Sequence, residues 1–285
     1  MIDRVTIYEV GPRDGLQNET RPIPTDSKIE LINRLSDCGF SRIEVASFVS
    51  PDRVPQMADG AAVMAGIERR PGIAYSALVP NLQGYGAAHA ARCDEVAIFT
   101  SASDSFSQRN VNASIGGSLE RFTPVAEAAR RDRVPLRGYV SCITDCPFEG
   151  SIAPEAVVAV VRSLLALGCH EISLGDTIGR GTPQRIGAML DAVLGVVGPE
   201  RLAGHFHDTG GRAMANIEVA LERGLRVFDA SVGGLGGCPF APGAPGNVAS
   251  EAVAARLAAL GFETGLDPER LAETAGFARS FRAAT

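Results

Sequence analysis

Strand-like and helix-like segments alternate along this chain from one end to the other. Glycine stands where helical segments stop, as at Gly168 and Gly224, and proline stands where a first helical turn tolerates it, as at Pro154 and Pro183. The predicted strands are Val5–Val10, Arg42–Ser47, Ile73–Val79, Glu95–Ser101, Leu136–Cys142, Glu171–Asp176, Leu202–Asp208 and Val227–Val232. The predicted helices are Asp26–Cys38, Val54–Arg69, Leu82–Ala91, Leu119–Arg131, Pro154–Leu167, Pro183–Val197, Arg212–Arg223 and Asn247–Leu260.

About eight strand–helix units in roughly 250 residues predict an α/β fold of the (β/α)8, or TIM, barrel type. A doubly wound sheet is the alternative, but it would have to bury two extra units. We find no linker, so residues 1–285 are expected to form a single catalytic domain. Residues 267–285 are expected to add a C-terminal helical extension that covers one end.

Charge and segment composition exclude several classes of protein. The formal net charge is −6, and no Lys/Arg run offers a surface for nucleic acid or for a membrane. No apolar run approaches the roughly 20 residues that span a bilayer, and the first residues resemble no signal or transit peptide. The expected location is therefore the cytoplasm.

Lysine is almost missing from the chain. Of 27 basic residues only Lys28 is a lysine, and it follows the helix-start residues Thr25–Ser27. This position is poor for a Schiff-base amine, so P-loop, pyridoxal and lysine-aldolase chemistry are not expected. A carbonyl substrate would have to be polarised by an arginine or a metal ion.

A glycine- and proline-rich segment, Gly233–Asn247, carries one thiol, Cys238, in its middle. Such a composition excludes helix or central strand, and it is shared by catalytic lids and by idle connections. Taken alone, the segment is equally compatible with both.

His205 and His207 lie one pleat apart on the seventh predicted strand, so both imidazoles project to the same face. In a barrel the active site lies at the C-terminal ends of the strands, where Asp14 and Asn247 are also expected. Two imidazoles, a carboxylate and an amide favour Mg2+, Mn2+ or another hard-to-borderline ion with open positions, without excluding zinc. The alternative is a hydrogen-bonded histidine pair in the core.

Arg13 precedes Asp14 at the end of the first strand, where Gly11-Pro12 fixes a turn. An arginine beside a metal can hold an enolate oxygen, whereas a surface ion pair would contribute little. Glu44 and Asp176, at the ends of two other strands, could orient Arg13 or the histidines, although a purely structural role fits these positions nearly as well.

Six motifs together resemble the 3-hydroxy-3-methylglutaryl-CoA (HMG-CoA) lyase family. They occur in family order over nearly the whole chain, and the cysteine-loop motif is the most specific. They are Val10–Glu19, Ile43–Pro51, Arg137–Cys142, Ser173–Gly179, His205–Thr209 and Gly234–Phe240.

The resemblance implies a retro-Claisen cleavage of HMG-CoA to acetyl-CoA and acetoacetate. It implies that Asp14, His205, His207 and Asn247 bind Mg2+ or Mn2+, which would grip the carboxylate and the tertiary hydroxyl of the acyl-CoA substrate. Cys238 would then protonate the carbanion that forms.

The resemblance also implies that Arg13 holds the thioester oxygen. Asp14 or a metal-linked group would act as the base, Gln17 would help bind substrate, and Glu44 and Asp176 would lie near the site. A homo-oligomer, dimer or higher, is expected from the family.

Three positions depart from the family pattern, and they put the preferred acyl group in question. Gly210 and Arg212 stand where an aromatic residue and a neutral amide are usual, and Thr20 stands where many members have lysine. A longer 3-hydroxy-3-alkylglutaryl-CoA is the natural variant substrate. Two competing functions are a Claisen-type acyl-CoA/2-oxoacid synthase and a binding barrel without catalysis.

Overall fold

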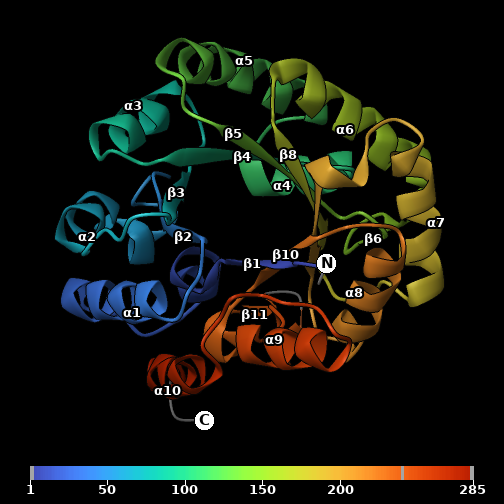
Figure 1. The fold of residues 1–285 in the computed structure, drawn as a ribbon. Coiled ribbons are helices and arrows are strands. Elements are labelled where there is room, and N and C mark those ends of the chain that lie inside the picture. Colours follow the sequence, from blue (N-terminus) through green and yellow to red (C-terminus); the bar gives the residue numbers. More distant parts are fainter. Residues whose placement is uncertain (1–2, 239–240, 283–285) are drawn as a thin grey trace.

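Eight parallel strands close into a barrel in the order β1-β10-β9-β8-β5-β4-β3-β2, and helices surround it (Figure 1). The computed structural model describes residues 3–238 and 241–282, without the side chains of residues 237–245. The strands are β1 (Thr6–Glu9), β2 (Arg42–Ser47), β3 (Ala74–Leu78), β4 (Glu95–Ser101), β5 (Leu136–Ser141), β8 (Glu171–Asp176), β9 (Leu202–Phe206) and β10 (Val227–Ala230). The (β/α)8 prediction is confirmed. The doubly wound alternative is wrong, because β1 pairs with both β10 and β2 and the sheet is thereby closed.

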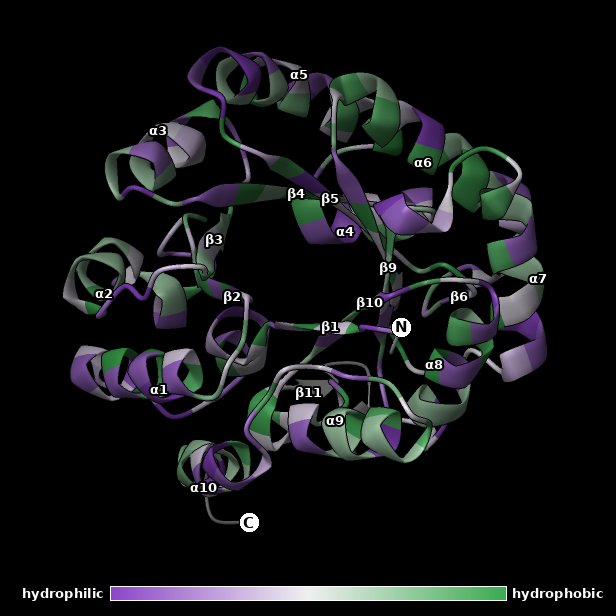
Figure 2. Ribbon diagram, viewed as in Figure 1, coloured by the Kyte–Doolittle hydropathy of each residue, from purple (hydrophilic) through white to green (hydrophobic). Residues whose placement is uncertain are grey.

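The helices that surround the barrel turn apolar faces toward it. In α6, Val157, Val160, Val161 and Leu164 are buried at helical spacing, and the helix ends at Gly168 with a φ of 99°. Hydrophobic and hydrophilic segments alternate around these helices in Figure 2. The helices are α1 (Thr25–Asp37), α2 (Gly60–Gly66), α3 (Leu82–Ala90), α4 (Asp104–Val111), α5 (Ile115–Asp132), α6 (Pro154–Leu167), α7 (Pro183–Leu194), α8 (Ala213–Glu222), α9 (Ser250–Ala259) and α10 (Pro268–Arg279).

The connections differ from the predicted pattern in three places. The helix expected over Val54–Arg69 is split into a 3-10 turn, η2 (Pro55–Met57), and the short helix α2. Helix α4 was not predicted, and it lies inside the ring of outer helices in Figure 1. Two small hairpins, β6–β7 (Asp145–Cys146 with Gly150–Ser151) and β11–β12 (Gly237–Cys238 with Ala241–Pro245), decorate the loops.

Helix α10 forms within the expected C-terminal extension and packs against α1, α9 and the 3-10 turn η4 (Val232–Gly234). Its first turn is capped by Asp267, whose side chain accepts hydrogen bonds from the backbone of Glu269 and Arg270. Along the described ranges, no helix is both long and apolar enough to cross a membrane.

Charged side chains fill much of the barrel interior, where apolar layers are usual. Arg137 on β5 donates from Nε to Glu171 Oε1 at 2.7 Å, and Arg42 on β2 pairs with both Glu171 and Glu95 at 2.8 Å. The Tyr8 hydroxyl donates to Glu95 Oε1 at 2.7 Å. These contacts tie strands β1, β2, β4, β5 and β8 together from the inside.

Candidate active site

The loop after β1 is a π-helical turn, η1 (Gly11–Gly15), that presents Arg13 and Asp14 at the C-terminal rim. The Val10 carbonyl accepts the backbone N–H of Asp14 at 2.7 Å, which closes the turn. A Cβ at Gly11 would lie 2.5 Å from Glu9 Oε1, so a side chain there would displace the buried Glu9 carboxylate from its hydrogen bonds. Such π-turns are frequent at functional sites.

Glu9, at the end of β1, is buried and connects this turn to the loop after β10. Its carboxylate accepts the N–H of Gly11 at 2.8 Å, the N–H of Val232 at 2.9 Å and the hydroxyl of Ser250 at 2.6 Å. Burial raises the pKa of Glu9 to about 7 despite these hydrogen bonds. The first and last loops of the barrel therefore share one anchor.

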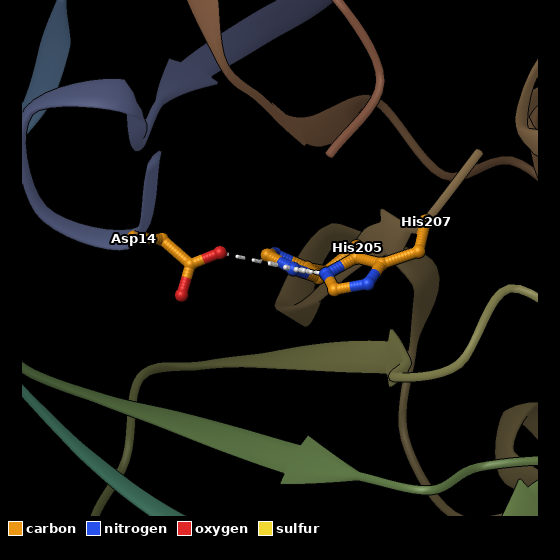
Figure 3. Close-up of side chains that lie close together, drawn as sticks. All are labelled: Asp14, His205 and His207. Atoms are coloured by element: carbon orange, nitrogen blue, oxygen red, sulfur yellow. Dashed lines mark hydrogen bonds and ion pairs between the residues drawn. The ribbon is translucent and has the colours of Figure 1, made fainter. Parts of the chain in front are cut away.

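Asp14, His205 and His207 converge at the rim (Figure 3), with candidate ligand atoms all within 4.8 Å of one another. His205 Nε2 lies 3.2 Å from His207 Nε2 and 3.8 Å from Asp14 Oδ2. Two imidazole nitrogens and a carboxylate oxygen facing a common point form a suitable donor set for a divalent cation. The structure thus brings the three predicted ligands together.

Electrostatics at the rim keep Asp14 ionised and His207 neutral. Burial alone would raise the pKa of Asp14, but Arg13 and the two histidines lower it to about 2. Burial, reinforced by His205, lowers the pKa of His207 to about 4. An ionised carboxylate and a neutral imidazole are the forms that bind a cation.

Asn247 is paired through its backbone with His207 and reaches the same site from the loop that precedes α9. Its side-chain nitrogen donates to Asp14 Oδ2 at 2.8 Å and to the Leu235 carbonyl at 3.3 Å. The amide nitrogen therefore faces Asp14, and a role as a metal ligand would use the other atom of this amide, the oxygen.

Arg13 is buried between two carboxylates. Its Nε donates to Glu44 Oε2 at 2.7 Å, and its Nη1 donates to Asp14 Oδ1 at 2.5 Å. Glu44 also accepts from the Tyr139 hydroxyl at 3.0 Å. Burial would lower the pKa of Arg13, but Glu44 and Asp14 raise it above its usual value, so the guanidinium is always charged. Glu44 thus contacts Arg13, one of the groups that the sequence analysis expected it to orient.

The other predicted site residues have different surroundings. Gln17 donates to Asp14 Oδ1 at 3.1 Å. Asp176 accepts from Gly181 N at 2.9 Å and from the Thr144 hydroxyl at 3.3 Å; its contacts in the described chain do not include Arg13 or a histidine. The backbone of Cys238 belongs to β11, and its side chain lies outside the described part of the structure.

Asp229 on β10 was missed by the sequence analysis. It contacts His205 Nδ1 through Oδ2 at 3.1 Å and is fully paired with Arg137. The one signal in the sequence is a carboxylate in the middle of an otherwise apolar strand, Val227–Ala230.

A cavity of about 1190 Å3 opens above these residues. Its lining includes Arg13, Asp14, Gln17 and both histidines, together with residues of α4 and of the β6–β7 connection. Thr20 lines it as well. Gly210 and Arg212 are exposed and are not among the lining residues of the described chain, so two of the three departures lie away from the cavity.

Comparisons with known proteins agree on one family. A family model described as HMGL-like matches residues 4–277. The 3-hydroxy-3-isohexenylglutaryl-CoA/hydroxy-methylglutaryl-CoA lyase of Pseudomonas aeruginosa is 55% identical over 270 residues, covering 95% of this chain and 90% of that protein.

Solved structures agree with this result. The HMG-CoA lyase of Brucella melitensis has a TM-score of 0.97 and 60% identity, covering 98% of this chain and 99% of that chain. An HMG-CoA lyase of Acinetobacter baumannii, solved with coenzyme A and 3-methylmalate, has a TM-score of 0.93 and 40% identity, covering 98% and 91%.

Asp176 gives a pH-dependent prediction. Burial raises its pKa from 3.8 to about 6, so the folded state binds the proton more tightly than the unfolded state does. As pH falls from about 7 to about 5, wild-type protein should gain roughly 1 kcal/mol of unfolding free energy relative to Asp176→Asn, which cannot titrate there. Urea unfolding of both proteins measures the difference, and parallel pH curves would contradict the prediction.

Proposed function

The chain belongs to the HMGL-like family, and from this premise we propose that it cleaves HMG-CoA to acetyl-CoA and acetoacetate. It is a carbon–carbon lyase. The observation that carries the proposal is the convergence of Asp14, His205 and His207 at the rim of a barrel, beside the buried arginine Arg13.

We propose Mg2+ or Mn2+ as the cation, held by Asp14, His205, His207 and the amide oxygen of Asn247. Nitrogen and carboxylate donors without a described thiolate suit these ions. A divalent cation bound there would make a substrate hydroxyl more acidic.

The chain's own residues divide the remaining work. A base, Asp14 or a neighbouring group, accepts the proton of the C3 hydroxyl. The C2–C3 bond then breaks, its electron pair moves into the thioester enolate, and the C3 carbonyl of acetoacetate forms. Arg13, already desolvated and charged, holds the enolate oxygen. Cys238 gives its proton to C2, which completes acetyl-CoA.

The cavity has the size and charge for an acyl-CoA. Three further arginines, Arg53, Arg109 and Arg121, line it, and guanidinium groups suit the phosphates of coenzyme A. The relative from Acinetobacter baumannii was solved with coenzyme A, which supports the same class of ligand here.

A longer 3-hydroxy-3-alkylglutaryl-CoA is a second candidate substrate. Four phenylalanines line the cavity, Phe99, Phe106, Phe122 and Phe148, and the two that are not buried, Phe99 and Phe148, offer apolar surface for a longer alkyl group. The 55% identical relative from Pseudomonas aeruginosa is named for both an isohexenyl and a methyl substrate.

Purified protein should release acetyl-CoA and acetoacetate in equal amounts from HMG-CoA when Mg2+ or Mn2+ is present. Exhaustive chelation should abolish release, because Asp14 and the histidines alone cannot activate the hydroxyl, and added metal should restore it. Thioester loss with product quantification is the measurement. Release of free CoA from acetyl-CoA plus a 2-oxoacid would instead indicate a synthase.

The Cys238→Ser variant should lose roughly 10²- to 10⁴-fold in kcat, because a serine hydroxyl is a far weaker acid than a thiol. Cys93→Ser is the matched control, since Cys93 is buried beyond the end of α3 and should not alter turnover. Steady-state kinetics decide the point, and unchanged activity in Cys238→Ser would reject the proton-donor role.

The range of substrates that the protein cleaves tests the proposed role of the phenylalanines that line the cavity. The isohexenyl analogue should be cleaved with a kcat/KM within about tenfold of that for HMG-CoA, because apolar burial offsets the ordering of a longer chain. A kcat/KM for the analogue more than about a hundredfold lower would restrict the enzyme to the methyl substrate.

A further inference from the structure

We propose that Asp229, held by Arg137, is a positioning residue that orients His205 so that its Nε2 atom can bind the cation. Both residues are sealed inside the barrel, with Arg137 at 0% and Asp229 at 2% exposure, and neither is among the described residues that line the cavity. This inference rests on the cation site of the proposed function, and it adds residues that do not contact the cavity.

The hydrogen bond to Asp229 determines which nitrogen of His205 carries the proton. Asp229 Oδ2 lies 3.1 Å from His205 Nδ1. Arg137 donates to both Asp229 oxygens and the Ser173 hydroxyl donates to Oδ2, so the carboxylate acts as an acceptor toward all of these partners. Nδ1 is therefore the nitrogen that donates to Asp229, and Nε2 is the nitrogen left to bind a cation.

Asp229 is itself held in one orientation by its other partners. Arg137 donates from Nη2 to Asp229 Oδ1 at 2.6 Å and from Nη1 to Oδ2 at 3.1 Å, a bidentate pair. The Ser173 hydroxyl donates to Oδ2 at 2.7 Å. Arg137 is in turn fixed by Glu171 at 2.7 Å. The Asp229 carboxylate therefore has one fixed orientation, and its hydrogen bond to Nδ1 fixes the orientation of the His205 imidazole.

The free nitrogen of His205 faces the other candidate ligands. Its Nε2 lies toward His207 Nε2 at 3.2 Å and toward Asp14 Oδ2 at 3.8 Å, at the mouth of the cavity. A flipped ring would lose the Asp229 hydrogen bond and leave a buried carboxylate oxygen with one donor fewer. Asp229 thus favours the one ring orientation that completes the donor set.

The cost of this arrangement supports a functional role. A buried ion pair is seldom more stable than apolar side chains of the same volume, and barrel interiors are ordinarily apolar. Carboxylate partners of metal-binding histidines typically strengthen metal affinity about 10- to 100-fold. The Arg137–Asp229 pair supplies such a carboxylate where a leucine or valine would have filled the space.

The test is Mn2+ binding to the full chain without substrate, measured by electron paramagnetic resonance. Asp229→Asn keeps the size of the side chain but removes its charge, and it should weaken Mn2+ binding about 10- to 100-fold. Glu95→Gln is the matched control, because Glu95 belongs to the same interior network through Arg42 and has no described contact with His205. It should lose thermal stability yet bind Mn2+ within about twofold of wild type.

Unchanged Mn2+ affinity in Asp229→Asn, or an equal loss in Glu95→Gln, would overturn the proposal. If Asp229→Asn does not fold, Ser173→Ala removes one donor to Asp229 and should show a smaller loss of affinity in the same direction. Nitrogen NMR of the histidines gives a second readout, in which wild-type His205 should carry its proton on Nδ1. A wild-type chain that binds Mn2+ but cleaves no HMG-CoA would reject the proposed function alone.

Discussion

The structure depends on the pairing of charges that the barrel encloses. Arg137 is fully buried and lies between Glu171 and Asp229, so strands β5, β8 and β10 each contribute one member of a single ionic cluster. A buried charge that loses its partner costs several kcal/mol, which makes any change in strand register unfavourable. The interior charges therefore set the relative heights of the strands together with the backbone hydrogen bonds.

Buried charges are also paired at the rim of the barrel, where the paired groups belong to the active site. Arg13 is held by Glu44 on one side and by Asp14 on the other, and Tyr139 shares the Glu44 carboxylate. Because these groups are already desolvated and oriented in the protein alone, little reorganisation is needed when charge develops on a substrate oxygen. The electrostatic preparation of the site is thus completed by folding.

The sequence was most informative where local pattern and fold agree. Alternating strand and helix segments predicted the barrel, and polar residues at strand ends predicted that Asp14, His205 and His207 would meet. Helix α4 (Asp104–Val111) was missed because it has only eight residues and most of them are polar. Asp229 was missed because its role depends on contacts with residues of β5 and β9. These residues are distant in sequence, so no local sequence pattern indicates the contacts.

Glu9 connects two segments that are synthesised at different times, and this affects when the site can form. It binds the turn after β1 to the segment after β10, where the two ends of the barrel sheet meet. Asp14 is synthesised long before His205 and Asn247, which follow it far along the chain. An incomplete chain therefore has no site at all, and the enzyme acquires its chemistry only when the last strand closes the ring.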